Sequence, residues 1–233
     1  MLFRSVVMTA AALASPLPSA TDTATPISLP PPTPVPNEQY TIAYLRRRTY
    51  GGGSFEIVNT MKETDQFTRY LIRYPSDGLA IYGFMNIPKG GGPFAVIIAI
   101  HGYEKPLSYK MLDSDTDTLD NIARNGFIVI HPNLRNYPPS DYGDDLFRVG
   151  TSIDVLNLIA LIKTQGKQPG ALEKAYNDRI GLWGHSMGGE IGLRVLTVSS
   201  DIKAAVLYAS LSGDEAKNAR LLYRVNQIGR AHV

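Results

Sequence analysis

The feature that most limits how this chain can fold is the run from Arg179 to Glu190, where a short apolar segment passes through Gly-His-Ser-Met-Gly into a helical pattern. The order Gly-x-Ser-x-Gly is typical of a nucleophile elbow, a tight turn from strand to helix that exposes the serine hydroxyl. Gly184 and Gly188 fit this turn because a Cβ atom at either position would collide with the crossing backbone. The following helix directs its free N–H groups at negative charge that develops beside Ser186. The run therefore predicts acyl-transfer chemistry at Ser186.

Alternating apolar segments on both sides of this turn predict an α/β architecture. Because strands that alternate with helices are joined by right-handed crossovers, the sheet is expected to be largely parallel, with sites at the carboxyl ends of its strands. Ser186 and the loop His101-Gly102-Tyr103 each follow such an end. The pattern predicts strands at 66–74, 79–86, 94–100, 127–130, 180–183 and 204–209, and helices within 115–125, at 151–163 and at 190–198.

Local signals refine this pattern. Ser76-Asp77-Gly78 is a turn between the first two strands, which are therefore expected to pair antiparallel. The unbroken apolar run at 94–100 is typical of a strand covered on both faces, and the strand at 204–209 is expected to be buried as well. The helix within 115–125 is expected to be capped by an Asp or Thr side chain and to stop at Gly126.

The first forty residues do not fit the α/β pattern. Small apolar residues and an Ala-x-Ala site predict a signal peptide or its remnant over residues 1–14, which is too short to span a bilayer. Residues 15–40 are rich in Pro and Thr, which predicts a disordered linker. We therefore expect an exported protein, extracellular, periplasmic or at the cell surface, with a partial α/β domain over residues 41–227.

The two extreme ends have an unusual composition. Residues 1–5 and 228–233 resemble translations of common sequencing-adapter DNA. We expect these residues to be foreign to the gene, and the chain to be a fragment that is cut at both sides and lacks the C-terminal part of its domain. We therefore expect no site residue among them.

Composition excludes several kinds of site. The 233-residue chain has no cysteine, which excludes disulfides and thiolate metal sites. Its formal net charge is +2, and its one basic run, Arg46-Arg47-Arg48, is interpreted as a solvated turn, so we expect no nucleic-acid partner. Asp141, Asp144 and Asp145 lack the spacing of metal ligands, and we expect neither a metal nor a cofactor.

Five segments in order resemble the α/β-hydrolase fold, and in particular the secreted, propeller-free serine hydrolases that are similar to prolyl oligopeptidase. The resemblance spans roughly Ile42 to Asn218. It implies a mostly parallel sheet with helices on both faces, which would be incomplete at the C-terminus. The matching segments are 74–83, 98–103, 124–130, 152–156 and 184–189.

The resemblance also implies roles for site residues. Ser186 is the expected nucleophile, and the backbone amides of Tyr103 and Met187 are the expected oxyanion hole, with Gly102 letting the backbone approach the substrate closely. The sequence departs from relatives that carry further glycines after His-Gly, because Tyr103 is followed by Glu-Lys-Pro.

The acid and base of a catalytic triad are the missing part. In the α/β-hydrolase fold they follow the serine, beyond at least two more strand–helix units of about 30 residues each. Only 47 residues follow Ser186 in the 233-residue chain, so we expect the acid and the histidine to be absent from it.

The residues that are present are weaker candidates for these roles. His232 is the single histidine after Ser186 and lies in the adapter-like tail, whereas His185 adjoins the serine and points the wrong way to accept its proton. His101 and His131 are interpreted as structural histidines. Asp214 remains a candidate acid, and Asp201 is interpreted as a carboxylate at a helix end.

These observations predict a serine hydrolase that cleaves an ester or peptide bond of a small molecule through an acyl-enzyme at Ser186. The fragment itself is expected to be inactive and, because the strand at 204–209 would form an open apolar edge, to aggregate on expression. The alternative is a non-catalytic binding module on an α/β-hydrolase scaffold. No membrane span is expected, and the sequence leaves the oligomeric state open.

Overall fold

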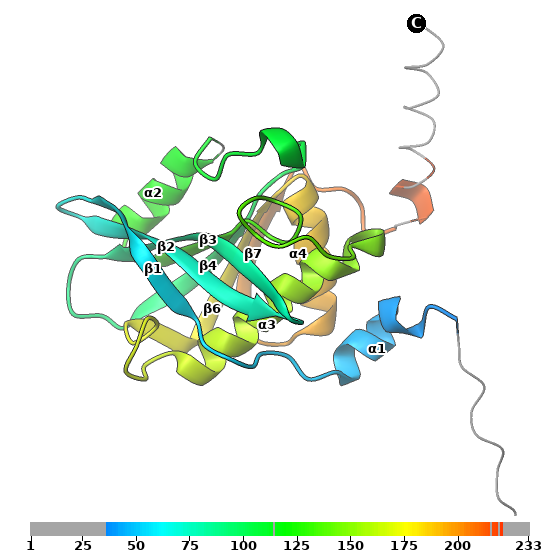
Figure 1. The fold of residues 1–233 in the computed structure, drawn as a ribbon, viewed down its shortest axis with the longest axis horizontal. Coiled ribbons are helices and arrows are strands. Elements are labelled where there is room, and N and C mark those ends of the chain that lie inside the picture. The colour runs from blue at the N-terminus through cyan, green and yellow to red at the C-terminus, as the bar shows by residue number, and fades with distance from the viewer. Residues whose placement is uncertain (1–35, 114, 215, 219, 221–233) are drawn as a thin grey trace, which may run out of the picture. The chain divides into compact units, whose positions relative to one another are not determined.

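A computed structural model describes residues 36–113, 115–214, 216–218 and 220, and all elements below belong to one unit that begins at Pro36. Among these residues, seven strands form one sheet in the order β1-β2-β3-β5-β4-β6-β7 (Figure 1). The predicted signal peptide and most of the predicted linker lie outside the described residues, as does the tail at 228–233. The strands are β1 (Glu56–Glu63), β2 (Phe67–Ser76), β3 (Leu79–Pro88), β4 (Phe94–Ile100), β5 (Ile128–Pro132), β6 (Ala175–His185) and β7 (Ile202–Tyr208).

Four α-helices and three short 3₁₀ helices have their bounds within the described residues, and residues 216–218 and 220 are helical as well. No described helix has the length and apolar character that a membrane span requires. The α-helices are α1 (Ile42–Arg47), α2 (Thr116–Arg124), α3 (Val149–Gln165) and α4 (Met187–Val198), and the 3₁₀ helices are η1 (Glu38–Tyr40), η2 (Pro106–Ser108) and η3 (Leu146–Arg148).

The sheet has an antiparallel part and a parallel part. β1, β2 and β3 pair antiparallel, and β3 pairs antiparallel with β5, whereas β5, β4, β6 and β7 are parallel to one another. The predicted hairpin is confirmed, since Ser76 pairs with Leu79 and the two residues between them, Asp77 and Gly78, have φ of 52° and 84°. Two successive positive φ angles match the turn type that joins twisted antiparallel strands.

Alternation along β4 explains why helices cover both faces of the sheet. Ile98 and Ile100 belong to a large apolar cluster that includes residues of α3 and α4, whereas Ala99 belongs to a smaller cluster with Leu119 and Ala123 of α2. Successive side chains of a strand point to opposite faces, so the two clusters lie on opposite sides of the sheet. This two-sided burial accounts for the unbroken apolar run of β4.

Buried ionic contacts hold the loop between β5 and α3. The guanidinium of Arg135 forms hydrogen bonds of 2.8 to 3.2 Å with both carboxylate oxygens of Asp154 on α3, and its backbone N–H donates to the same carboxylate. Ser76 Oγ donates to Asp154 over 2.6 Å. The side chain of Asp154 is fully buried and that of Arg135 is 7% exposed, so each of these buried charges is compensated by the other.

The structure differs from the expectations in several elements. α1 and β1 were not expected from the sequence, and η1 begins before the expected end of the linker at residue 40. Backbone pairing with β2 holds β1 in place, and all eight residues of β1 are exposed. Its side chains therefore have no alternation of buried and exposed positions that the sequence could have shown. The expected cap of α2 is also wrong, because Asp115 has a φ of 57° and makes no capping hydrogen bond.

β7 is the last strand of the sheet among the described residues. It was expected to be buried, but most of its residues are exposed, with 61% of Val206 accessible to solvent. The reason is that β6 pairs with one side of β7 and no described strand pairs with the other. The expected open edge is therefore present in the described part of the chain.

Buried His131 makes stability depend on pH. Burial lowers the pKa of this imidazole from 6.5 to about 3, and the neighbouring His101 contributes in the same direction. The unfolded chain protonates His131 near pH 6.5, so its contribution to the free energy of unfolding is full above that pH and is lost as the pH falls towards 3. We expect this loss to reach about 2–3 kcal/mol between pH 6.5 and 4.5. Urea unfolding across this range will show a smaller loss of the free energy of unfolding for His131→Asn than for the wild type. Equal losses in the two proteins would show that His131 is not the source of the pH dependence.

Candidate functional site

Ser186 is held in a strained turn between β6 and α4. Its φ is 51° and its ψ is −111°, a backbone conformation that residues other than glycine rarely adopt. Such a residue costs about 1–3 kcal/mol and persists where the surrounding structure forces it. The backbone N–H of Ser186 donates to the carbonyl of Tyr208 on β7 over 3.1 Å, which helps to hold the turn. The residue is half-buried, and no hydrogen bond to its Oγ is present among the described residues.

Close backbone contacts explain the glycines around Ser186. A Cβ atom on Gly184 would lie 2.6 Å from the carbonyl oxygen of Gly188, and one on Gly188 would overlap the carbonyl oxygen of Ile100 at the end of β4. A Cβ atom on Gly189 would lie 2.5 Å from that of Ser210. The start of α4 therefore packs directly on the ends of β4 and β7, and only glycine allows this distance.

The loop after β4 lies against the serine, as its place at a strand end predicts. A Cβ atom built on Gly102 would lie 3.5 Å from Ser186 Cβ and 3.4 Å from His185 Nδ1, which are ordinary contact distances. Tyr103 follows with its side chain exposed, and Met187 is the first residue of α4 and is buried. The two backbone amides expected to form an oxyanion hole thus belong to segments that adjoin Ser186.

Arg148 contacts both of these segments, which the sequence did not indicate. Its Nη1 lies 3.1 Å from Met187 Sδ, its guanidinium lies 5.9 Å from the centre of the Tyr103 ring, and its Nε donates to Glu190 Oε2 over 3.1 Å. The Met187 sulfur also accepts a hydrogen bond of 3.6 Å from Tyr137. Arg148 has a φ of 55° although it is not a glycine, and no turn motif at this position signals that conformation.

His185 is engaged on its own side of the elbow. Its Nδ1 lies 3.7 Å from Asp115 Oδ2, and its ring stacks on Tyr208 with 4.6 Å between ring centres. The hydroxyl of Tyr208 donates to the other carboxylate oxygen of Asp115 over 3.4 Å. The side chain of Asp115 is therefore directed at β6 and β7, which explains why it does not cap α2.

The acidic candidates lie in separate places. Asp214, exposed after β7, accepts a hydrogen bond of 2.9 Å from the backbone N–H of Lys217. Asp201 precedes β7, at the end of the sheet opposite to Ser186, and pairs with Lys163 at 2.6 Å. His232 lies outside the described residues. In the described chain, no group of three or more His, Asp or Glu side chains is arranged to hold a metal ion.

The three aspartates of the loop before α3 bind different donors. Asp141 accepts from the backbone of Ala80, Asp144 accepts from the hydroxyl of Tyr40, and Asp145 accepts from Thr151. These contacts attach the loop to β3, to η1 and to the first turn of α3. Their role in the structure is therefore to hold the loop.

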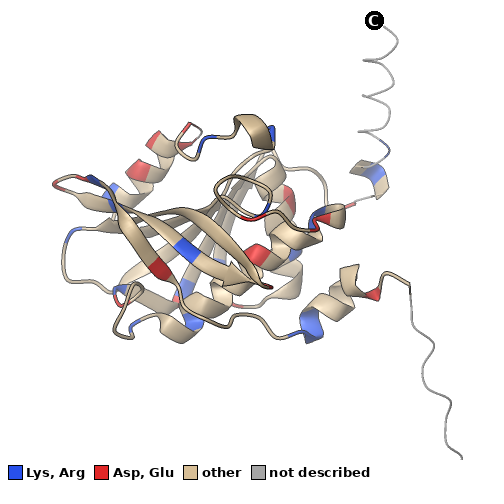
Figure 2. Cartoon of the chain, in the orientation of Figure 1, with Lys and Arg blue, Asp and Glu red and all other residues tan. Residues whose placement is uncertain are grey.

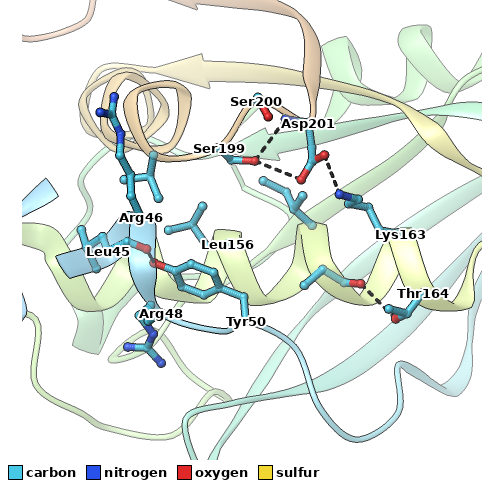
Figure 3. Close-up of a pocket in the computed structure, with 13 residues that line it drawn as sticks. Leu45, Arg46, Arg48, Tyr50, Leu156, Lys163, Thr164, Ser199, Ser200 and Asp201 are labelled. Carbon is cyan, nitrogen blue, oxygen red and sulfur yellow. Dashed lines mark hydrogen bonds and ion pairs between the residues drawn. The ribbon is translucent and has the colours of Figure 1, made fainter. Parts of the chain in front are cut away.

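A cavity of about 350 Å³ lies away from the serine, between α1, α3 and the segment that joins α4 to β7 (Figure 3). Its apolar floor includes Leu45 and Leu156. Its three cations already have oxygen partners: Lys163 binds Asp201, Arg46 donates to the carbonyl of Thr197, and Arg48 binds Asp77.

Charges of both signs are interspersed along the chain (Figure 2). The basic run that was expected to be a solvated turn spans the end of α1 and the residue after it. Each of its arginines bonds to an oxygen, with Arg47 paired to Glu38 at 2.6 Å. This run is therefore attached to the fold and does not form a free basic patch.

Comparison with known proteins identifies the family of this chain. A family model described as the alpha/beta hydrolase fold matches residues 95–226. Among solved structures, the chain is similar to an acetyl xylan esterase from Paenibacillus sp. R4, with 18% identity, a TM-score of 0.52, and coverage of 70% of this chain and 55% of that one. No curated protein matches the chain.

Two further solved structures show the same likeness. Acetyl xylan esterase 1 from Thermoanaerobacterium sp. JW/SL YS485 has 17% identity and a TM-score of 0.50, with coverage of 65% of this chain and 50% of that chain. An esterase from Pyrococcus furiosus has 18% identity and a TM-score of 0.50, with coverage of 68% and 58%. This chain therefore spans about half the length of the structures that it matches, and at these identities the likeness is one of fold.

Proposed function

Because the chain belongs to the family of the alpha/beta hydrolase fold, we propose that the whole protein is a serine hydrolase that cleaves esters through an acyl-enzyme at Ser186. The observation that carries the proposal is the strained backbone of Ser186, with a φ of 51°, in the turn that joins β6 to α4. Strain of this kind at a residue with a nucleophilic side chain is typical of functional sites. The proximity of Gly102 to Ser186 adds support, because it brings a second backbone segment to the same serine.

The proposed reaction has two steps. A general base removes the Ser186 proton while Oγ bonds to the ester carbonyl carbon, and the amides of Tyr103 and Met187 stabilise the resulting oxyanion. The intermediate collapses, the alcohol leaves with the proton from the base, and water then hydrolyses the acyl-serine. No described histidine is hydrogen-bonded to Ser186, so we place the histidine base outside the described residues. Asp214 remains a candidate for the acid.

We favour an ester over a peptide as the substrate. The solved structures named above are esterases, which supports this choice. The resemblance to hydrolases similar to prolyl oligopeptidase supports peptide cleavage instead. The two readings differ in the leaving group, which is an alcohol in one and an amine in the other.

Paired substrates test the proposal on the whole protein. We expect hydrolysis of p-nitrophenyl acetate and little hydrolysis of the matching p-nitroanilide, because an amine is the poorer leaving group. A fluorophosphonate reagent should label Ser186, as mass spectrometry of the peptide will show. The 233-residue chain alone should hydrolyse the ester far more slowly, since without a base it retains only binding and the oxyanion hole.

The opposite result identifies the alternative function. A folded whole protein that neither hydrolyses the ester nor reacts with the fluorophosphonate would favour a non-catalytic binding module. Cleavage of the anilide at a rate similar to that of the ester would favour a peptidase.

A further inference from the structure

His101 is a buried histidine directly after β4, next to the proposed oxyanion loop. It has no solvent exposure. The rings of Tyr137 and Tyr109 surround it with centres at 4.6 and 4.9 Å, and the ring of His131 lies 5.7 Å away. The imidazole is therefore held in one position by packing, and its two nitrogens face fixed partners.

Both of these partners are backbone carbonyl oxygens. Nδ1 lies 2.7 Å from the oxygen of Gly102 and Nε2 lies 2.9 Å from that of Asn133. Neutral imidazole carries a single N–H, so it can donate to only one of the two. The other nitrogen then directs a lone pair at a carbonyl oxygen, which is repulsive. The position of one proton therefore decides which carbonyl is held.

The surroundings favour neutral imidazole at neutral pH. Burial lowers the pKa of His101, while the two carbonyl oxygens and the carboxylates of Glu104 and Asp115 act in the opposite direction with smaller effects. The remaining titratable groups that face the ring are His131, Tyr109 and Tyr137. At neutral pH, the carbonyl oxygens of Gly102 and Asn133 therefore compete for the single N–H of His101.

The carbonyl of Gly102 has a direct link to the proposed chemistry. Gly102 C=O and Tyr103 N–H belong to one planar peptide group and, in the trans form, point in opposite directions. A donor that holds the carbonyl therefore also sets the direction of the amide. The contact at Gly102 is the shorter of the two that His101 makes.

We propose that His101 is the positioning residue of the oxyanion hole, and that its Nδ1–H holds Gly102 O so that the amide of Tyr103 stays directed at the substrate. This inference rests on the proposed function of Ser186. A proton on Nε2 would hold Asn133 instead and release the Gly102–Tyr103 peptide. The tautomer of one buried histidine therefore sets one of the two oxyanion donors.

The tautomer can be measured without any hydrolysis. Long-range ¹H–¹⁵N spectra of the ¹⁵N-histidine-labelled chain distinguish a proton on Nδ1 from one on Nε2, and single histidine variants assign the signals. We expect the Nδ1–H form of His101 to predominate between pH 7 and 8. A predominant Nε2–H form would overturn the proposal. The tautomer is determined from the spectrum of the wild-type chain, and the variants serve only to assign its signals.

Variants of the whole protein test the effect on catalysis. His101→Phe keeps a ring in the aromatic cluster and removes the donor, and we expect kcat for p-nitrophenyl acetate to fall about 10²–10³-fold, as for the loss of one oxyanion donor. KM should stay within about twofold, because the donor acts on the oxyanion of the transition state. His101→Asn, which offers an amide N–H close to the position of Nδ1, should recover most of the loss.

His131→Asn is the matched control. His131 is equally buried, and its Nδ1 also contacts a backbone carbonyl, that of Ala99 at 2.9 Å, but this carbonyl lies within β4. The control should lose stability and keep kcat within about twofold. Equal kcat losses in the control and in His101→Phe would overturn the proposal, because a general loss of packing would then explain both.

One further readout separates this proposal from the proposed function. Hydrogen exchange and the NMR signal of the Tyr103 amide report its orientation in the unmodified chain and in His101→Phe. If the whole protein hydrolyses no ester, the proposed function fails, while a shifted and faster-exchanging Tyr103 amide still supports the positioning role. An unchanged Tyr103 amide would overturn it.

Discussion

Replacing Ser186 with alanine will reduce kcat of the whole protein for p-nitrophenyl acetate by a factor on the order of 10⁶, while the fold remains intact. The loss is this large because the proposed acyl-enzyme cannot form without the hydroxyl. Initial rates and fluorophosphonate labelling measure the effect, and circular dichroism checks the fold. Ser200→Ala is the control, since Ser200 is exposed and lies near the opposite end of the sheet. A Ser186→Ala variant within tenfold of wild type would contradict the proposed nucleophile.

The same position should show that the strained backbone lowers stability. Glycine tolerates the φ of 51° and ψ of −111° that Ser186 adopts, so Ser186→Gly relieves strain of about 1–3 kcal/mol. Part of this gain is offset by the greater freedom of glycine in the unfolded chain, about 1 kcal/mol. We therefore expect Ser186→Gly to be inactive and about 1 kcal/mol more stable than Ser186→Ala in urea unfolding. A less stable glycine variant would contradict strain at this turn.

Replacing Arg135 with methionine will lower the free energy of unfolding by about 3–5 kcal/mol. The variant leaves the carboxylate of Asp154 without its guanidinium partner, in a side chain that has no solvent exposure. A buried charge without a partner is far more costly than the loss of the attraction itself. Urea unfolding of the 233-residue chain measures the effect through the transition midpoint, provided that the slope is unchanged.

Two controls separate this effect from a general effect of removing arginine. Arg47 pairs with Glu38 at a similar distance, but their side chains are 64% and 45% exposed, so Arg47→Met should change stability by at most about 1 kcal/mol. The double variant Arg135→Met with Asp154→Leu removes both buried charges and should be more stable than Arg135→Met alone. Equal losses for Arg135→Met and Arg47→Met would contradict the argument.

The turn at Ser186 was predictable because its requirements lie in adjacent residues. Gly184 and Gly188 are needed where the backbone of the elbow and the end of β4 come within a distance that excludes a Cβ atom. The hairpin between β2 and β3 was predictable for the same reason, since Asp77 and Gly78 supply both positive φ angles of the turn. In both places, the residues that the local sequence supplies are the ones that the backbone conformation of the turn requires.

The surroundings of the serine were not predictable, because their partners are distant in the chain. Arg148 reaches Met187 and Tyr103 from the loop before α3, and Asp115 reaches His185 from the end of another loop. The sequence around an arginine or an aspartate in a polar loop does not indicate which distant residue its side chain will contact. The exposure of β7 was also missed, because its apolar residues read alike at the edge and in the middle of a sheet.

The sequence by itself determined the order of the strands and helices from β2 to β7, the α/β architecture and the place of Ser186, because apolar periodicity and glycine spacing act over a few residues. The tertiary structure alone decided that Arg148 and Asp115 lie beside the elbow and that His101 is enclosed between two carbonyl groups. These contacts form only when the ends of parallel strands are brought together by the sheet. Which polar atoms then face one another depends on packing across the whole fold, and no short stretch of the chain contains that information.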